Sequence, residues 1–183
     1  MLTSIKDDNE VMHIAATLMK KLWKTIEPTA ARPTTQQWFS RLDLPINLPD
    51  NFSPSLIDKA KQIAQALHQS IEETVLLHGD LHHTNILSSK RQPWLAIDPK
   101  GVIGEREYEV GALLRNPIPD IAKTDNLKEI IANRVSMLAE LLSFDKQKII
   151  AWGFSQAVLA AVWSLDADDA SWQCFVKCAE GLN

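Results

Sequence analysis

The stretch HGDLHHTNIL, residues 78–87, holds three histidines, an aspartate, a threonine and an asparagine between apolar runs. Residues 75–77 before it and residues 86–87 at its end are apolar. Short apolar runs next to polar turn residues are typical of buried strands. We therefore expect the polar residues in a loop between two strands, which is where catalytic and binding side chains are often found.

The sequence around this loop predicts a small β-hairpin layer. Residues 75–77, 85–87 and 94–97 have the composition of short strands, and the polar residues 88–92 form the turn between the last two. Asn85 begins the second of these strands and Asp98 directly follows the third. The hairpin is therefore expected to bring Asn85 and Asp98 to one end of the structure.

Helical periodicity covers most of the rest of the chain. Apolar residues recur at three- and four-residue spacing in six segments, which are residues 11–22, 56–71, 107–114, 127–142, 146–165 and 171–178. Between the first two segments, residues 27–54 contain five prolines, with at most a short helix at 36–42. The expected fold class is α+β, mainly helical, with the hairpin layer holding the polar loop.

The composition favours a soluble globular chain. Of the 183 residues, 45% are hydrophobic and 23% charged, close to the average for such domains. A net charge of -4 argues against a nucleic-acid partner, which usually requires a basic surplus. No signal peptide and no apolar run near the roughly 18 residues needed to span a bilayer are found. We expect a cytoplasmic protein without membrane contact, with Cys174 and Cys178 as free thiols.

A metal-dependent hydrolase is one interpretation of the polar loop. Its ligands would be His78, Asp80, His82 and His83. Such a centre normally takes a further ligand from another part of the chain. The remaining histidines, at positions 13 and 68, fall within predicted amphipathic helices, which makes this interpretation the weaker one.

A loop for phosphoryl transfer explains more of the residues. This chemistry needs a carboxylate that orients the attacking hydroxyl and accepts its proton, and oxygen ligands that hold Mg²⁺. Asp80 offers the first carboxylate. Asn85 offers an amide oxygen, and Asp98 offers a second carboxylate at the end of the predicted hairpin.

Four motifs in order resemble one known family. HGDLHHTNIL is followed by WLAIDPKGVIGE at residues 94–105, YEVGALLRNP at 108–117 and WGFSQAVLAAVWSL at 152–165. Together they resemble the aminoglycoside 6-phosphotransferases, or streptomycin kinases, and the related hydroxyurea phosphotransferases. The resemblance extends over nearly the entire chain. It implies the C-terminal lobe of the protein-kinase-like fold and an antibiotic-resistance kinase that uses ATP and Mg²⁺ to phosphorylate an alcohol group.

The resemblance also implies roles for individual residues. Asp80 would be the catalytic base, and Asn85 and Asp98 would bind Mg²⁺. His78 would set the backbone of the catalytic loop, and Glu109 would accept hydrogen bonds from its amides. Thr84 departs from the family, which usually has glycine at this position, and this puts the expected backbone angles there in doubt.

Other candidates keep two interpretations. Arg115 would be a buried structural partner, and Lys100 would contact phosphate or remain a solvated surface lysine. Trp152 and Trp163 are expected in the core rather than stacked on an acceptor. The final group either attracts a cationic acceptor or forms a solvated helix end, and consists of Asp166, Asp168 and Asp169.

The expected organisation is a single kinase-like C-terminal lobe, residues 1–183. It divides into a helical part with a proline-rich connection at 1–74, catalytic and metal loops at 75–104, and a helical part at 105–183. Nothing before Asp7 resembles the family's N-terminal nucleotide-binding lobe. The chain alone is therefore expected to bind Mg-ATP weakly and to favour a homodimer or a separately encoded lobe as partner.

Two further questions stay open at the level of sequence. The chain could be an active phosphotransferase, or a catalytically inactive remnant that serves as a binding module. The acceptor could be a streptomycin-like aminoglycoside, hydroxyurea or an unrelated metabolite alcohol.

Overall fold

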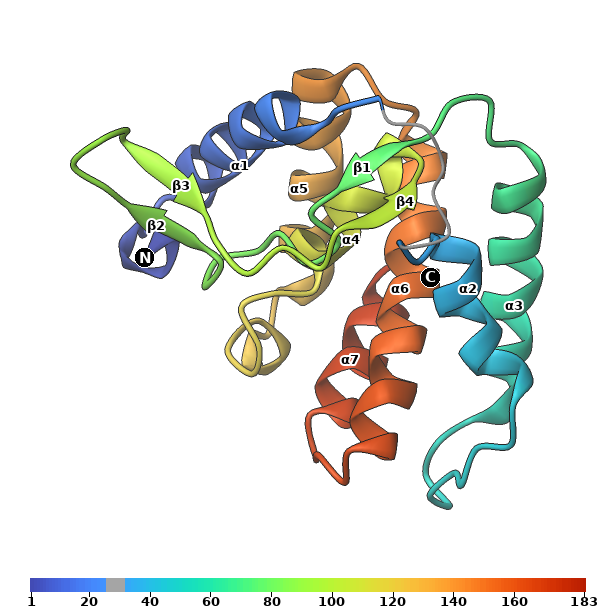
Figure 1. Cartoon of the computed structure of the whole chain (residues 1–183). Coiled ribbons are helices and arrows are strands. Elements are labelled where there is room, and N and C mark those ends of the chain that lie inside the picture. The colour runs from blue at the N-terminus through green and yellow to red at the C-terminus, as the bar shows by residue number, and fades with distance from the viewer. Residues whose placement is uncertain (26–31) are drawn as a thin grey trace.

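A computed structural model describes residues 1–25 and 32–183 (Figure 1). Seven α-helices and four short strands are present in the described part, together with four short 3-10 helices. The α-helices are α1 (Asp8–Leu22), α2 (Thr35–Phe39), α3 (Pro54–Gln69), α4 (Val110–Leu114), α5 (Leu127–Leu142), α6 (Lys146–Asp166) and α7 (Trp172–Gly181). The predicted α+β class, mainly helical, is confirmed. Residues 26–31, part of the predicted proline-rich connection, lie outside the described residues.

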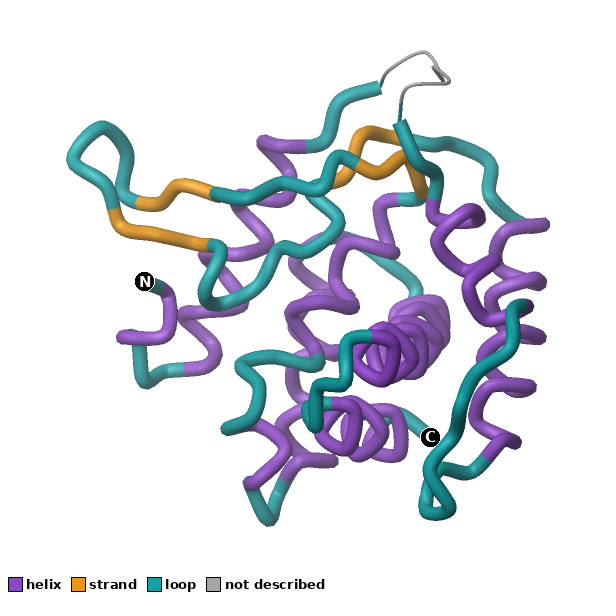
Figure 2. Tube along the Cα trace, turned by 60° about the horizontal axis from the view of Figure 1, so that its bottom comes forward, coloured by secondary structure: helices purple, strands orange, loops and turns teal. Residues whose placement is uncertain are grey.

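The strands form two separate antiparallel ribbons. They are β1 (Val75–Leu77), β2 (Ile86–Ser88), β3 (Trp94–Ala96) and β4 (Val102–Gly104). β1 pairs with β4, with Val75 opposite Gly104, and β2 pairs with β3, with Ile86 opposite Ala96. Both ribbons lie along one side of the molecule, with most of the helices on the other (Figure 2). The predicted hairpin is present, but it forms only half of the β structure.

The fourth strand was missed by the sequence prediction. β4 is only three residues long and follows Gly101, which has a φ of 68°. Its partner strand lies more than twenty residues earlier in the chain, so local periodicity could not reveal the pairing. The β1–β4 ribbon matters for the site because it places the residues that follow β1 beside the residues that precede β4.

Helix α6 forms the centre of the hydrophobic core. It packs against α3, α4 and α7, and thirteen of its residues are buried. By length and composition α6 could cross a membrane, although the sequence analysis found no such run. Of its most apolar 18-residue window, 72% is buried inside the fold, as expected for the core helix of a folded domain. Trp152 on this helix is fully buried, as predicted, and its indole N–H donates to Glu105.

Helix α1 is attached to the body by a partly buried ion pair. Asp7 caps its N-terminus by accepting a hydrogen bond from the backbone of Asn9. Arg134, only 4% exposed on α5, donates to both carboxylate oxygens of Asp8 at 2.6 and 2.8 Å. The same guanidinium donates to the carbonyl oxygen of Leu113 at 3.0 Å. Because the two-pronged guanidinium matches carboxylate geometry, this contact fixes α1 against α5 and the end of α4.

His83 is buried near this ion pair. The side chain is 3% exposed, and its Nδ1 atom has no hydrogen-bond partner among the described residues. Burial, followed by the positive charge of Arg134, lowers the pKa of His83 from 6.5 to about 3. The native state therefore keeps this ring neutral at pH values where an unfolded chain would protonate it.

The free energy of unfolding is expected to depend on pH through His83. Between pH 6.5 and about 3 the unfolded chain binds the additional proton, so stability falls as the pH is lowered. The slope can reach about 1.4 kcal/mol per pH unit. Urea unfolding at pH 7.5 and 5.0 should show a smaller loss for His83→Phe than for the wild type. His13→Phe, an exposed control on α1, should keep the wild-type slope; equal slopes in all three proteins would contradict the prediction.

Candidate active site

His78 joins the two polar loops. Its backbone carbonyl accepts hydrogen bonds from the amides of Lys100 at 2.8 Å and Gly101 at 3.3 Å. Its ring Nε2 lies 2.8 Å from the carbonyl oxygen of Ile97, and its Nδ1 accepts from the amide of Asp80 at 3.3 Å. Because a carbonyl can only accept, Nε2 carries the proton and the ring is neutral. Burial lowers the pKa of His78 and favours this neutral form.

Glu109 fixes the first residues of the polar loop 78–87 by hydrogen bonds to their backbone. This side chain is 1% exposed, and its two carboxylate oxygens accept the backbone amides of His78 at 2.7 Å and Gly79 at 2.8 Å. Burial raises the pKa of Glu109 to about 7, against the lowering effect of the two amide donors. Each amide would otherwise be a buried donor without a partner, so the carboxylate determines the path of the chain into Asp80.

Gly79 permits a close approach at the same point. Its φ is 84°, a region that side-chain-bearing residues rarely adopt. A Cβ atom there would lie 2.8 Å from Val102 and 2.9 Å from the ring of Trp38. The φ of Thr84 is not positive, so threonine fits the backbone conformation at this position, where the resembling family usually has glycine.

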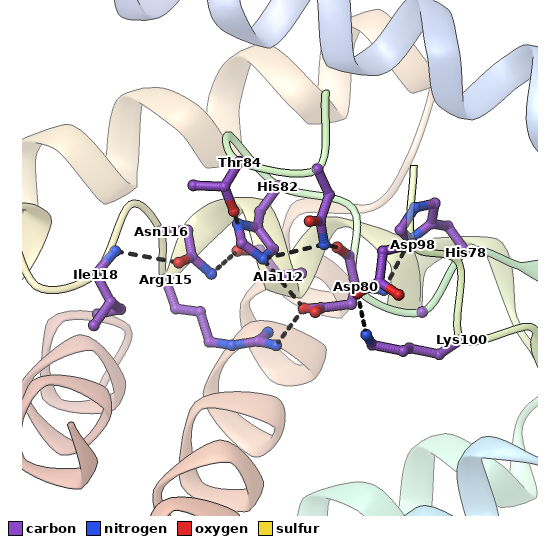
Figure 3. A network of polar contacts seen from close by, with 12 residues as sticks. His78, Asp80, His82, Thr84, Asp98, Lys100, Ala112, Arg115, Asn116 and Ile118 are labelled. Carbon is purple, nitrogen blue, oxygen red and sulfur yellow. Dashed lines mark hydrogen bonds and ion pairs between the residues drawn. The ribbon is translucent and has the colours of Figure 1, made fainter. Parts of the chain in front are cut away.

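Asp80 lies among cationic and polar side chains (Figure 3). Its Oδ1 is 3.6 Å from Arg115 Nη2 and 3.6 Å from His82 Nε2. Burial alone would raise the pKa of Asp80, but the contact with His82 and the charge of Arg115 outweigh it and hold the pKa below its usual range. Asp80 is therefore ionised at neutral pH and can accept a hydrogen bond from a hydroxyl group.

Asn85 and Asp98 lie next to one another through a backbone contact. The amide of Ile97 donates to the backbone carbonyl of Asn85 at 2.9 Å, which places Asp98 beside this residue. The Nδ2 group of Asn85 donates to the carbonyl oxygen of Asp80 at 2.9 Å, so its Oδ1 atom remains available as an acceptor. Asp98 has a φ of 56°, an uncommon conformation for a residue with a side chain.

This donor set fits a divalent cation of the magnesium type. Asp98 supplies carboxylate oxygens on a side chain that is 64% exposed, and Asn85 supplies one carboxamide oxygen. Magnesium prefers hard oxygen ligands and usually keeps several water molecules, so two protein ligands suffice. The Nζ atom of Lys100 lies 2.5 Å from Oδ2 of Asp98, which shows that a cation can approach this carboxylate.

A cavity of about 440 Å³ lies beside Asp80. Its charged lining residues are Asp80, Lys100, Arg115 and Asp169, and Arg115 is 7% exposed. The rest of the lining is largely apolar and aromatic, and consists of Trp38, Gly79, Ala160, Trp163, Ser164, Ala167 and Phe175. Asp80 therefore faces a space large enough for a small acceptor molecule.

The prediction that Trp163 packs in the core is wrong. Its side chain is 37% exposed and lines the cavity, at 5.6 Å from Trp38 in an edge-to-face arrangement. α6 is buried without interruption from Trp152 to Val162, directly before this position, so the apolar character of the helix concealed the exposed Trp163.

The three predicted acidic candidates fall in different places. Asp169 lines the cavity. Asp166 is bound to Arg41, with oxygen–nitrogen distances of 2.5 and 2.7 Å, and does not line it. Asp168 is exposed and also outside the cavity lining. Of this group, only Asp169 lines the cavity, and its Oδ1 accepts hydrogen bonds from the amide and hydroxyl groups of Ser171 at 2.9 Å.

The histidines of the loop do not converge on a hydrolytic metal centre. His78 bonds to the carbonyl oxygen of Ile97, while His83 points into the body near Arg134. In the described part of the chain, no group of three or more His, Cys, Asp or Glu side chains is arranged to hold a metal ion. The alternative of a metal-dependent hydrolase therefore receives no support from the geometry.

Two contributors to the site were missed by the sequence analysis. Trp38, on α2, reaches the cavity from a segment forty residues before the catalytic loop. Gln156, on α6, accepts a hydrogen bond from Arg115 at 3.1 Å and so orients that guanidinium. Both lie on helices, where apolar periodicity predicts burial but does not indicate which cavity a side chain lines.

Several known proteins are similar to this chain in sequence. Residues 1–168 match the family described as "Aminoglycoside/hydroxyurea antibiotic resistance kinase". A streptomycin 6-kinase from Streptomyces griseus is 25% identical over 168 residues, which is 90% of this chain and 55% of the relative. A hydroxyurea phosphotransferase from Kitasatospora aureofaciens is 31% identical over 91 residues, 50% of this chain and 24% of the relative. The chain thus spans about half the length of the streptomycin 6-kinase.

A solved structure shows the same fold at low sequence identity. The crystal structure of a choline kinase from Streptococcus pneumoniae superimposes with a TM-score of 0.67 at 11% identity. The match covers 97% of this chain and 65% of the choline kinase chain. The arrangement of helices and ribbons is therefore that of a kinase-like fold. With the family match over residues 1–168, the chain belongs to the aminoglycoside/hydroxyurea antibiotic resistance kinases.

Proposed function

We propose that this chain carries the catalytic and magnesium loops of an ATP-dependent phosphotransferase that acts on an alcohol group of a small molecule. The observation that carries the proposal is the cavity lined by Asp80, with Asn85 and Asp98 held beside it through His78 and Ile97. A base, an amide oxygen and a second carboxylate are the side chains that phosphoryl transfer to a hydroxyl requires.

In the proposed reaction, Asp80 accepts a hydrogen bond from the acceptor hydroxyl. As the hydroxyl oxygen bonds to the terminal phosphorus of ATP, its proton passes to Asp80 and the bond from that phosphorus to the ADP oxygen breaks. Mg²⁺, held by Asn85 and Asp98, would neutralise charge on the nucleotide phosphates. Arg115 keeps Asp80 ionised and oriented toward the cavity.

The cavity also bears on the choice of acceptor. Asp169, Trp38 and Trp163 are among the residues that line it. Carboxylates and aromatic faces both attract cationic groups. This combination favours an aminoglycoside acceptor over hydroxyurea, and both compounds are needed in the assay.

Replacing Asp80 should abolish transfer without unfolding the chain. Asp80→Asn keeps the size of the side chain but removes the proton acceptor, so the rate should fall by about 10²–10⁴-fold. The purified chain is incubated with radiolabelled Mg-ATP and either streptomycin or hydroxyurea, and the phosphorylated acceptor is measured. Asp50→Asn, an exposed control, should retain the wild-type rate.

The same assay tests the alternatives. Product formed at an undiminished rate by Asp80→Asn would contradict the proposed base. A folded chain that binds metal yet forms no product with either acceptor would favour the non-catalytic binding module or a chain that requires a separately encoded nucleotide-binding lobe.

Replacing Asp98 should weaken metal binding specifically. Asp98→Asn removes the charge of the proposed ligand, so the affinity for Mn²⁺, used as a spectroscopic substitute for Mg²⁺, should fall by at least about tenfold. Electron paramagnetic resonance measures free Mn²⁺ directly and does not depend on turnover. Asp50→Asn again serves as the control. Unchanged Mn²⁺ affinity in Asp98→Asn would rule out the proposed metal site.

A further inference from the structure

Lys100 occupies a position between two functional carboxylates. Its Nζ atom is bound to Oδ2 of Asp98 at 2.5 Å, and its side chain also lines the cavity that contains Asp80. Figure 3 shows Lys100 extending below both carboxylates, with its contact to Asp98 drawn. No sequence pattern distinguished this contact from that of a solvated surface lysine.

The contact places Lys100 in competition with a metal ion. A magnesium ligand oxygen lies about 2.0–2.1 Å from the ion, and a second cation on the same carboxylate would be repelled. The Lys100 and Asp98 side chains are 41% and 64% exposed, and exposed ion pairs are weak. A divalent ion can therefore displace the ammonium group at little cost.

The displaced ammonium group has a defined destination. Lys100 is held at its backbone, because its amide donates to the carbonyl of His78 at 2.8 Å. Only the flexible four-carbon stem can move. The cavity beside Asp80 is already lined by this side chain. Under the proposed function, the transferred phosphoryl group would arrive in this cavity. Arg115 lines the same cavity, so the two cations would face the phosphoryl oxygens together.

We propose that Lys100 is an internal counter-cation of Asp98, which divalent-metal binding displaces toward the phosphoryl group in the Asp80 cavity. In the metal-free chain, Lys100 balances the negative charge of Asp98. When a metal ion binds Asp98, the ammonium group of Lys100 is released toward the phosphoryl group, where negative charge develops during transfer. This inference rests on the proposed function, because it takes Asp98 as the metal ligand and the cavity as the place of transfer.

Metal affinity and nucleotide affinity should respond to Lys100 in opposite directions. Lys100→Met removes the competing cation, so Mn²⁺ should bind about two- to fivefold more tightly in the absence of nucleotide. Mn-ATP should bind more weakly than to the wild type, because one phosphate-facing charge is lost. Lys100→Arg keeps a positive charge at this position, so its Mn²⁺ affinity should stay close to that of the wild type. Lys20→Met, an exposed lysine on α1, is the control and should change neither affinity.

A second measurement follows the displacement directly. The ¹⁵N-labelled ammonium resonance of Lys100 should shift when Mg²⁺ is added to the wild type, and this shift should be absent in Asp98→Asn. In the double variant Asp98→Asn/Lys100→Met, removal of Lys100 should no longer change Mn²⁺ affinity, because the shared carboxylate charge is gone.

The outcomes separate this inference from the proposed function. Loss of Mn²⁺ binding in Asp98→Asn, together with unchanged or weaker binding in Lys100→Met, would overturn the role of Lys100 while leaving the metal site intact. Unchanged binding in Asp98→Asn would overturn the metal site itself. Tighter Mn²⁺ binding with equal or tighter Mn-ATP binding in Lys100→Met would rule out the movement toward the phosphoryl group.

Discussion

The bidentate contact between the Glu109 carboxylate and the amides of His78 and Gly79 is the constraint on which the site depends. It turns the chain sharply after β1, at a residue whose φ only glycine adopts readily. His78 then links this turn to the loop that follows β3. Without the buried carboxylate, two amides would lack partners, and the relative position of Asp80 and Asp98 would no longer be fixed.

The positions of the side chains around Asp80 and Asp98 follow from the same backbone contacts. Arg115 and His82 face one oxygen of Asp80, and Lys100 contacts the carboxylate of Asp98. These three side chains come from well-separated parts of the sequence, and the loops at the ends of the ribbons and of α4 bring them into one region. Preorganised charges of this kind act on a reacting group without the reorganisation that water requires.

The sequence predicted the parts whose signals are local. Long helices such as α1 and α3 follow apolar periodicity closely, and the polar decapeptide stands out by its composition. The proximity of Asn85 and Asp98 was predicted because a hairpin joins them directly.

Features that depend on non-local pairing could not be predicted in the same way. The β1–β4 ribbon joins two strands that residues 78–101 separate in the sequence. The ion pair between Asp8 and Arg134 spans more than a hundred residues. Trp163 shows a further limit. Its periodicity places it on an apolar helix, and only the position of α2 decides that this tryptophan lines a cavity instead of the core.

The residues that line the cavity beside Asp80 come from two different parts of the fold. Asp80 and Lys100 belong to loops fixed by Glu109 and His78, whereas the facing wall is contributed by α2, the end of α6 and α7. The α2 side is attached to α6 through the Arg41–Asp166 ion pair and the Trp38–Trp163 contact. Substitutions in that wall can reshape the space offered to an acceptor without disturbing the loops. The shape of this cavity can therefore vary independently of the loop geometry on its opposite side.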